Sequence, residues 1–323
     1  MSPERVGPKT MYAPVVVFVY KRPQHTVRTI EALAANQLAA ETDLSVFSDG
    51  PRNLADTDAV REVRAYIDSL SSRSLFRSVR VFKAEENRGL AESVISGVSE
   101  VIERWGRVIV LEDDQVSTPA FLRFMNDALD KYHSSQDVWS ISGYSPPIDL
   151  PKDYSAEVYF GYRGSSWGYG TWQNRWSQVD WSVTDYAAFR RSRSSMRRLN
   201  RGGRDMAHML SMQMEGSIDS WAIRWCYAQS QLDMLTVYPI RSQIQNIGLD
   251  GSGTHSGLAT RYAATLGSAP NADGLCDPFL DRRIVRASRD FHGSRYQYVR
   301  SLLGTRVKGL IRLRANRPMS RDA

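Results

Sequence analysis

The chain lacks the features that mark several common protein classes. It has two cysteines in 323 residues, Cys226 and Cys276, which are too few for a disulfide framework and lack the spacing of a metal site. We therefore expect two buried thiols, as suits a reducing cytoplasm. No apolar run approaches the roughly 20 residues that cross a bilayer. The N-terminal segment also lacks the apolar core of a secretory signal, so we expect a cytoplasmic protein.

Two phosphate-binding motifs are also missing. No G-x-G-x-x-G follows the first apolar run, and G-x-x-x-x-G-K-[ST] occurs nowhere in the sequence. These glycine-rich loops hold the phosphates in Rossmann dehydrogenases and P-loop NTPases. Their absence argues against both classes.

Positive charge is concentrated at one end of the chain. The formal net charge is +7, and segment 295–323, with eight basic residues and one acid, accounts for all of it. A neutral body with a basic tail argues against a nucleic-acid binder. Apolar residues recur at helical spacing in the tail, which predicts a basic amphipathic helix that either binds an anionic membrane surface or packs on the body. A second run, 190–204, has seven arginines and no acid, and is expected to be a solvated loop or a site for an anionic substrate.

The first half of the chain alternates short β-branched runs with longer helical patterns. The predicted strands are 15–20, 44–47, 79–82, 108–111 and 139–141, and the predicted helices are 24–38, 55–70, 89–104 and 119–132. This alternation predicts an α/β fold with a mainly parallel central sheet flanked by helices, a Rossmann-like nucleotide-binding half over 12–147. In such sheets, ligands bind beyond the carboxyl ends of the strands.

Three consecutive acids, Glu112, Asp113 and Asp114, end the run 108–111. Adjacent carboxylates repel one another, and burial adds to the cost of their charges. A divalent cation such as Mg²⁺ or Mn²⁺ removes that cost and bridges protein to substrate phosphates. The alternative is a solvated strand end that begins a turn.

The other strand ends carry a mixture of charges. Arg22 follows the first strand, Asp49 the second, and the sequence Glu-Asn-Arg at 86–88 the third. Basic and acidic residues together at these strand ends suit the binding of a nucleotide diphosphate with its metal.

From about residue 148 the sequence becomes rich in aromatic residues and glycine. We expect 148–260 to be the acceptor-side, catalytic half of the same domain, and 261–323 to be a C-terminal extension with the basic helix. Glycines allow close backbone approach, and flat rings match the apolar faces of sugars. Core packing is the alternative for most of these rings, but the loop around Trp167, Gly168 and Tyr169 resembles a substrate-facing segment.

Taken in order, several short motifs resemble those of a known family. They are a strand ending in Arg22, Ser-Asp-Gly at 48–50, Glu-Asn-Arg-Gly-Leu at 86–90, Val-Leu-Glu-Asp-Asp at 110–114, Trp-Gly-Tyr-Gly-Thr-Trp at 167–172 and Ile-Asp-Ser-Trp at 218–221. Over about residues 12–256 the chain resembles glycosyltransferases of the GT-A fold, near the bacterial family 2 enzymes and the N-acetylglucosaminyltransferase I type.

The resemblance implies a metal-dependent, inverting transfer of a sugar from a UDP-sugar to a glycan or lipid-linked hydroxyl. It assigns Asp114 to Mn²⁺ or Mg²⁺, Asp113 to its support, and Glu112 to the donor sugar. It assigns nucleotide and donor contacts to Tyr20, Arg22, Asp49, Asn87 and Arg88. The contacts to the acceptor sugar are assigned to Trp167, Gly168, Tyr169 and Trp221.

Two further assignments stay open from the sequence. Asp219 matches the general base that takes the acceptor proton, or is the N-cap of a helix that begins at Trp221. His255 completes the metal shell or is a solvated loop residue.

Two other functions compete with this one. A sugar-nucleotide pyrophosphorylase would carry a glycine-rich basic loop after the first strand, which this chain lacks. A non-catalytic carbohydrate-binding protein would use the aromatic segment without a metal. For location, we expect the cytoplasm or the inner face of the cytoplasmic membrane.

Overall fold

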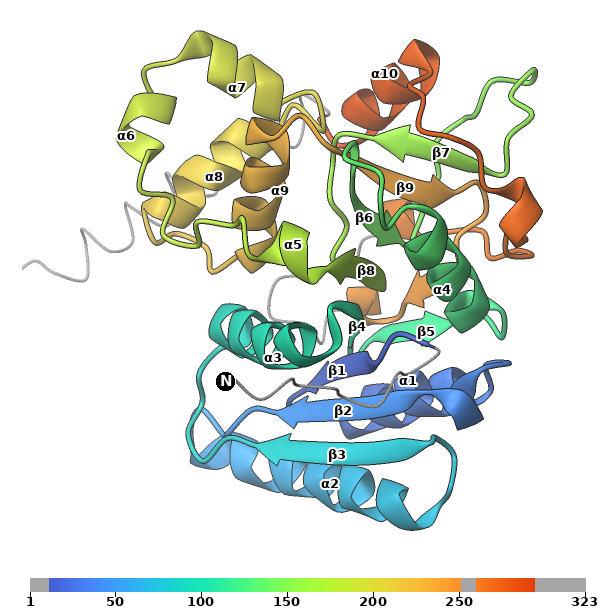
Figure 1. The fold of residues 1–323 in the computed structure, drawn as a ribbon. Coiled ribbons are helices and arrows are strands. Elements are labelled where there is room, and N and C mark those ends of the chain that lie inside the picture. The colour runs from blue at the N-terminus through green and yellow to red at the C-terminus, as the bar shows by residue number, and fades with distance from the viewer. Residues whose placement is uncertain (1–11, 251–259, 294–323) are drawn as a thin grey trace, which may run out of the picture.

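The computed structural model describes residues 12–250 and 260–293. An eight-stranded sheet with the order β3-β2-β1-β4-β8-β6-β9-β7 runs through this part of the chain, and β5 pairs with β10 in a separate ribbon (Figure 1). The strands are β1 Val15–Val19, β2 Asp43–Ser48, β3 Ser78–Lys83, β4 Arg107–Glu112, β5 Gln115–Ser117, β6 Val138–Ser142, β7 Val158–Gly161, β8 Tyr169–Trp172, β9 Leu235–Pro239 and β10 Ile244–Asn246. The helices are α1 Pro23–Ala34, α2 Thr57–Ser69, α3 Leu90–Trp105, α4 Phe121–Lys131, α5 Gln173–Trp176, α6 Tyr186–Phe189, α7 Arg193–Leu199, α8 Met206–Met214, α9 Trp221–Gln231 and α10 Arg282–Phe291.

The predicted α/β class is confirmed, with a mostly parallel sheet between helices. β1 is parallel to β2 and β4, β2 is parallel to β3, and β6 is parallel to β9, whereas β8 and β7 run antiparallel to their neighbours. Strands from the two predicted halves share this sheet, because β8 lies between β4 and β6.

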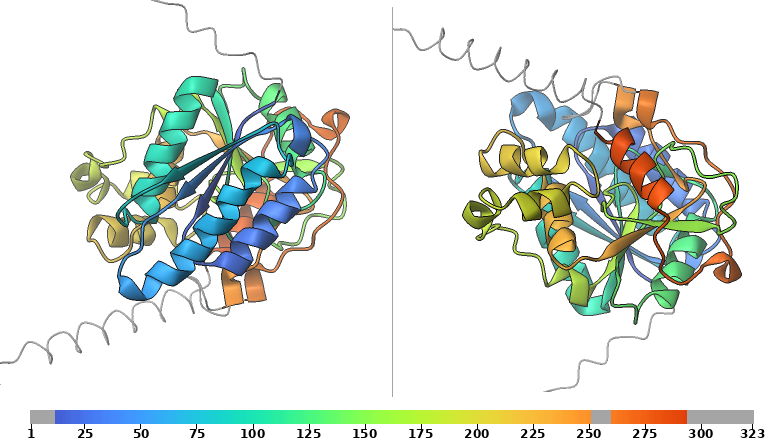
Figure 2. Two further views of the ribbon diagram at one scale, coloured as in Figure 1. Left: turned by 90° about the horizontal axis from the view of Figure 1, so that it is seen from below. Right: turned by 90° about the horizontal axis from the view of Figure 1, so that it is seen from above.

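Helices cover both faces of the first strands, which explains the continuous apolar run of β1. Val15 and Val17 pack with the residues of α1 and α2, whereas Val16 and Phe18 pack with those of α3. Figure 2 shows α1 and α2 on one side of the sheet and α3 on the other. A strand buried on both faces needs β-branched or aromatic residues at every position.

The five predicted strands and four predicted helices are all present, and most ends agree within two residues. The exception is α1, which ends at Ala34 instead of residue 38. The side chain of Asn36 turns inward, accepts a hydrogen bond from the Leu122 amide at 2.9 Å and donates one to Ser117 Oγ at 2.9 Å. These contacts fix the chain in a turn after Ala34.

The basic run 190–204 was expected to be a solvated loop or a site for an anionic substrate, and the loop prediction is wrong for its central part. Residues Arg193–Leu199 form α7, because Ser192 caps the helix by accepting a hydrogen bond from the Ser195 amide. The three residues after Ser192 read Arg-Ser-Ser and show no apolar pattern, so the cap was the signal that could have identified the helix.

Core packing accounts for most of the aromatic segment. Tyr169, Trp172 and Trp176 are buried, and a cluster of rings that includes Trp221 and Trp225 packs on α3 and β4. Cys226 is buried as expected, whereas Cys276 is half-buried. Among the described helices, none is long and apolar enough to cross a membrane. The predicted basic helix of the tail and His255 lie outside the described residues.

Candidate active site

The three acids lie where β4 leaves the sheet. Glu112 is the last residue of β4, and Asp113 and Asp114 lead directly into β5. β5 and its antiparallel partner β10 were not predicted from the sequence. This ribbon holds the acids in place, because the Ile247 amide donates to the Asp114 carbonyl at 2.8 Å and Asn246 Nδ2 lies 3.4 Å from Asp114 Oδ1.

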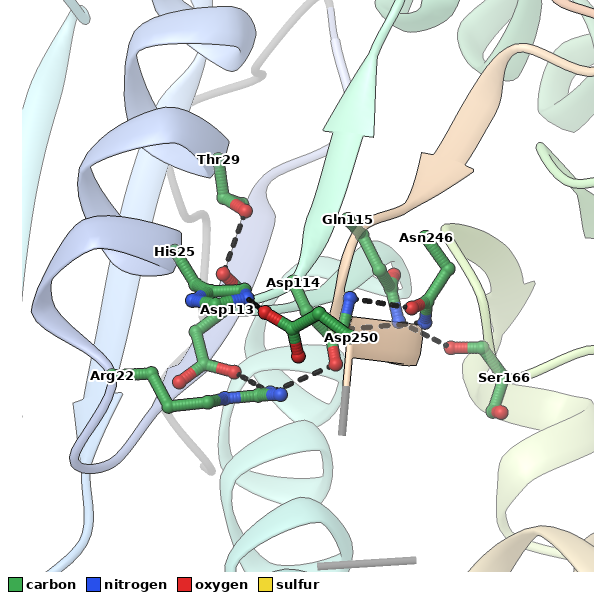
Figure 3. A network of polar contacts seen from close by, with 10 residues as sticks. Arg22, His25, Thr29, Asp113, Asp114, Gln115, Ser166, Asn246 and Asp250 are labelled. Carbon is green, nitrogen blue, oxygen red and sulfur yellow. Dashed lines mark hydrogen bonds and ion pairs between the residues drawn. The ribbon is translucent and has the colours of Figure 1, made fainter. Parts of the chain in front are cut away.

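Arg22 neutralises two of the three carboxylates. Its Nη2 contacts Asp113 Oδ1 and lies 2.8 Å from Asp114 Oδ2 (Figure 3). The side chains of Arg22, Asp113 and Asp114 are 18%, 6% and 11% exposed, so the pairs lie largely out of water. Burial lowers the pKa of Arg22, but the two carboxylates outweigh this effect and raise its pKa above the ordinary value. The guanidinium is therefore the resident counter-ion of this cluster.

The other titratable groups respond to the same environment. Burial, together with the carboxylates of Asp114 and Asp113, raises the pKa of Glu112 to about 8, and Arg22 opposes this shift. Burial also raises the pKa of Asp113, again against the effect of Arg22. Three adjacent acids thus carry less than three negative charges near neutral pH.

A second layer surrounds Asp113 and Asp114. Thr29 Oγ1 donates to the Asp113 carbonyl at 2.8 Å, and His25 Nε2 lies 3.1 Å from Asp250 Oδ2 (Figure 3). Gly248 passes so close that a Cβ there would lie 2.2 Å from Asp114 Oδ2. Only glycine leaves room for the Asp114 carboxylate at this point.

Asp49 organises the neighbouring strand end. Its two carboxylate oxygens accept hydrogen bonds from the amides of Gly50, Arg88 and Gly89 and from Asn87 Nδ2, at 2.8 to 3.0 Å. The bonds fix the turn that precedes α3, in which Gly89 has a φ of +80°. The predicted residues Asp49, Asn87 and Arg88 therefore form one structural unit.

Tyr20 belongs to a different contact. Its hydroxyl donates to Asp56 Oδ2 at 2.7 Å and accepts from the Arg52 amide at 2.9 Å. Lys21 Nζ lies 2.6 Å from the other oxygen of Asp56. The hydroxyl of Tyr20 thus holds the segment after β2.

Asp219 reaches the same region from the second half of the chain. A Cβ on Gly89 would lie 3.5 Å from Asp219 Oδ2, so this exposed carboxylate lies beside the turn that Asp49 organises. The alternative that Asp219 caps α9 is wrong, because Ser220 is the N-cap and accepts from the Ile223 amide. Its carboxylate is therefore available for another role.

The predicted acceptor residues differ in exposure. Tyr169 and Trp221 are buried, with their ring centroids 5.3 Å apart, and offer no ring face to a ligand. Trp167 is half-buried and meets Tyr144 edge-on at 4.5 Å. The Gly168 amide donates to Gln115 Oε1 at 2.7 Å, a contact that the sequence analysis missed.

Gln115 links the aromatic loop to the acids. Besides accepting from Gly168, its Nε2 donates to the Ser166 carbonyl at 3.3 Å (Figure 3). Gln115 follows Asp114 directly in the chain, so the acids and the loop around Trp167 share one support.

The chemistry of the donor set fits a divalent cation. Asp113 and Asp114 supply carboxylate oxygens, and Asp113 Oδ2 is buried without a hydrogen-bond partner among the described residues. Arg22 already occupies the position of a positive charge between these carboxylates. In residues 12–250 and 260–293, no group of three His, Cys, Asp or Glu side chains is arranged as a ready metal site. A metal would therefore have to share these carboxylates with Arg22 or displace it.

Comparison with known proteins gave structural likenesses and no family. No protein-family model and no curated protein matches the chain. S. aureus TarS is similar over 49% of this chain and 28% of its own, with 14% identity and a TM-score of 0.35. A structure of TarS 1-349 is similar over 72% and 59%, with 10% identity and a TM-score of 0.40. GalNAc-T7 with UDP, GalNAc and Mn²⁺ is similar over 71% and 43%, with 10% identity and a TM-score of 0.45.

The chain spans less than two thirds of the length of each of these proteins. At this level of similarity they do not define the activity of the chain, which has to be argued from its own residues.

Proposed function

We propose that the protein is a glycosyltransferase of the GT-A type that moves a sugar from a UDP-sugar to an acceptor hydroxyl with the help of a divalent metal. The observation that carries this proposal is the meeting of distant acids at one edge of the sheet. Asp49, the acids 112–114 and Asp219 come from three separate parts of the chain. They lie at neighbouring strand ends and beside the turn before α3.

The donor side follows from the charges at these strand ends. β1 lies between β2 and β4, so Arg22 and Asp49 follow strands whose backbones are about 4.8 Å apart. Amides and the side chain of Asn87 surround Asp49, and Arg88 follows in an exposed position. A ribose hydroxyl or a base edge could bind at the polar turn, with the diphosphate towards Arg22.

Asp114, with Asp113 in support, is the pair that would hold the metal. When bound, a divalent ion supplies Lewis-acid stabilisation of the negative charge on the departing nucleoside diphosphate. With a cation on these carboxylates, the guanidinium of Arg22 would be free to turn from them towards the phosphates. Glu112, whose pKa is raised to about 8, can donate a hydrogen bond to a sugar hydroxyl in its neutral form.

Asp219 is the residue we assign as the general base of an inverting reaction. Its exposed carboxylate can accept the proton of the acceptor hydroxyl as that oxygen attacks the anomeric carbon. Trp167, half-buried beside Gly168, is the aromatic residue open to an acceptor sugar. Glycans and lipid-linked sugars are the proposed acceptors, and peripheral attachment to an anionic membrane remains a proposal for the tail.

A panel of nucleotide-sugars tests this function directly. We expect the purified protein with Mn²⁺ to release UDP from one UDP-sugar, and UDP-GlcNAc, the ligand named for TarS, is the first to test. Asp219→Asn should abolish transfer to an acceptor and leave donor binding intact, because the base touches only the acceptor. Asp233→Asn, on the surface away from these strand ends, is the matched control.

The non-catalytic alternative makes a different prediction. A carbohydrate-binding protein would bind sugar equally well with and without metal, and would tolerate Asp114→Asn. No turnover of any nucleotide-sugar, with sugar binding unchanged by chelation, would favour that alternative.

A further inference from the structure

A basic pocket lies apart from the acids described above. It has a volume of about 630 Å³ and is lined by Tyr162, Arg204, Leu280, Arg282, Val285, Arg286 and Arg289. Four of these seven residues are arginines, and none is an acid. The pocket forms where α10 lies against the segment between α7 and α8.

Three of the arginines share one face of α10. Arg282, Arg286 and Arg289 are spaced four and three residues apart, which places them on one side of a helix. Ile284 on the opposite side is buried with Tyr159 and Tyr238, and this contact fixes which face α10 presents to the pocket. Like charges at this spacing repel one another, so the arrangement costs stability unless an anion is present.

The arginines of the pocket are poorly neutralised by the protein. Within the described residues, Arg282 and Arg289 form no ion pair, and Arg289 Nε is buried without a hydrogen-bond partner. Asp290 serves both remaining arginines, at 2.6 Å from Arg204 and 3.9 Å from Arg286.

Arg283 shows the contrast on the same helix. It points away from the pocket and is paired with both Asp153 and Asp281 at 2.7 to 2.8 Å. Among residues 12–250 and 260–293, the protein therefore provides two carboxylates for the arginine outside the pocket, and Asp290 alone for the four arginines that line it. The pocket keeps an excess of about three positive charges.

We propose that this arginine pocket binds a phosphate ester. A guanidinium pairs bidentately with phosphate or carboxylate, but a carboxylate brings one negative charge, whereas a phosphate monoester brings nearly two and three acceptor oxygens. The excess charge therefore favours phosphate. Tyr162, Leu280 and Val285 supply an apolar wall for the group that carries it, and the volume admits a sugar phosphate.

If the protein transfers a sugar as proposed above, the phosphate ester that this pocket binds is part of the acceptor. Arg204 precedes α8 and Asp219 follows it, and nine helical residues span about 14 Å. An acceptor that is several sugar or phosphate units long can reach from the pocket towards the base. This placement makes the substrate class a phosphorylated glycan.

Calorimetric titration with glucose 6-phosphate tests the pocket, with UDP and Mn²⁺ in excess to occupy the donor site. We expect Arg282→Gln/Arg286→Gln to weaken binding at least about tenfold, because each charged hydrogen bond contributes more than a factor of ten in affinity. Arg193→Gln/Arg197→Gln on α7 removes the same charge at the same spacing from an exposed surface, and should leave binding unchanged.

Three results would overturn the proposal. One is equal binding by the pocket variant and the wild type, and another is glucuronate binding as tightly as glucose 6-phosphate. In the third, the wild type does not bind glucose 6-phosphate but binds phosphatidylglycerol vesicles, and the pocket variant loses the vesicle binding. This result would assign the pocket to lipid headgroups.

The two proposals fail separately. Phosphate binding requires no turnover. A protein without transferase activity that still binds glucose 6-phosphate through α10 would therefore support the phosphate pocket and refute the proposed glycosyl transfer. In an active protein, the pocket variant should raise the KM for a phosphorylated acceptor and leave the hydrolysis of the donor unchanged. An unchanged KM would show that the pocket does not bind the acceptor.

Discussion

Replacing Arg22 by methionine removes the guanidinium that contacts Asp113 and Asp114 and keeps much of the side-chain volume. Removing one partner of a buried ion pair costs about 3–5 kcal/mol, and we take about 3 because Arg22 is 18% exposed. A chain of this size loses roughly 2 °C of Tm per kcal/mol, so we expect a Tm about 6 °C lower in chelator. A divalent cation at about 100 times its Kd would restore about 2.7 kcal/mol, because it supplies the missing positive charge.

Thermal unfolding of three proteins, each with EDTA and with Mn²⁺, checks this reasoning. The wild type should gain less from Mn²⁺ than Arg22→Met, since in the wild type the ion has to share the carboxylates with the guanidinium. Arg61→Met is the control, because the Arg61–Asp58 pair is exposed and contributes at most about 1 kcal/mol. A Tm of Arg22→Met equal to that of the wild type in EDTA, or a rise with Mn²⁺ no larger than that of the control, would refute the role of Arg22 as counter-ion.

Three further predictions concern other parts of the molecule. Gly248→Ala should weaken Mn²⁺-dependent UDP binding at least about tenfold, because its Cβ would lie 2.2 Å from Asp114 Oδ2. Gly161→Ala, whose Cβ would have its nearest contact at 3.4 Å, is the control and should bind UDP as the wild type does. Equal titration curves for the two variants would contradict this prediction. Asp49→Ala should lower the free energy of unfolding by about 3 kcal/mol in a urea titration, because four hydrogen-bond donors lose their acceptor. An unchanged urea midpoint would contradict the role of Asp49 in the turn before α3. Burial raises the pKa of Cys226 to about 11, so its thiol stays protonated below that pH. An aromatic disulfide reagent at pH 8 should therefore modify Cys276 alone until the protein unfolds. Fast reaction of both thiols in the folded protein would contradict this prediction.

The sequence predicted those parts of the fold in which one physical signal dominates. Four of the five residues of β1 and residues 108–110 of β4 are β-branched, because helices cover both faces of these strands. The ribbon of β5 and β10 has no such signal, since three residues such as Gln115–Ser117 are too short to show a period. Its positions are fixed by contacts between residues far apart in the sequence.

The site was predicted to a similar extent. Arg22, Asp49 and the acids 112–114 were identified because charged residues at strand ends of a parallel sheet meet at one edge. That Arg22 would pair with Asp113 and Asp114 was not predicted, because the direction of a long side chain depends on its neighbours in space. Tyr169 and Trp221 were assigned to the acceptor sugar through the family resemblance, and only the packing of α9 on α3 and β4 shows that they are core residues.

Gly248 belongs to a glycine-rich run of the sequence, and its role in the structure is close approach to a carboxylate. Asn246, two residues before Gly248 and the last residue of β10, carried no signal in the sequence that distinguishes it from a turn residue.

Equilibrium binding of UDP to the wild type and to Asp114→Asn, each with and without Mn²⁺, tests the central claim most directly. We expect the wild type to bind UDP much more tightly with Mn²⁺, and Asp114→Asn to lose this gain while still unfolding in a cooperative thermal transition. Equal binding by both proteins, with no effect of the metal, would contradict the assignment of the acids 112–114 to a metal-assisted nucleotide site.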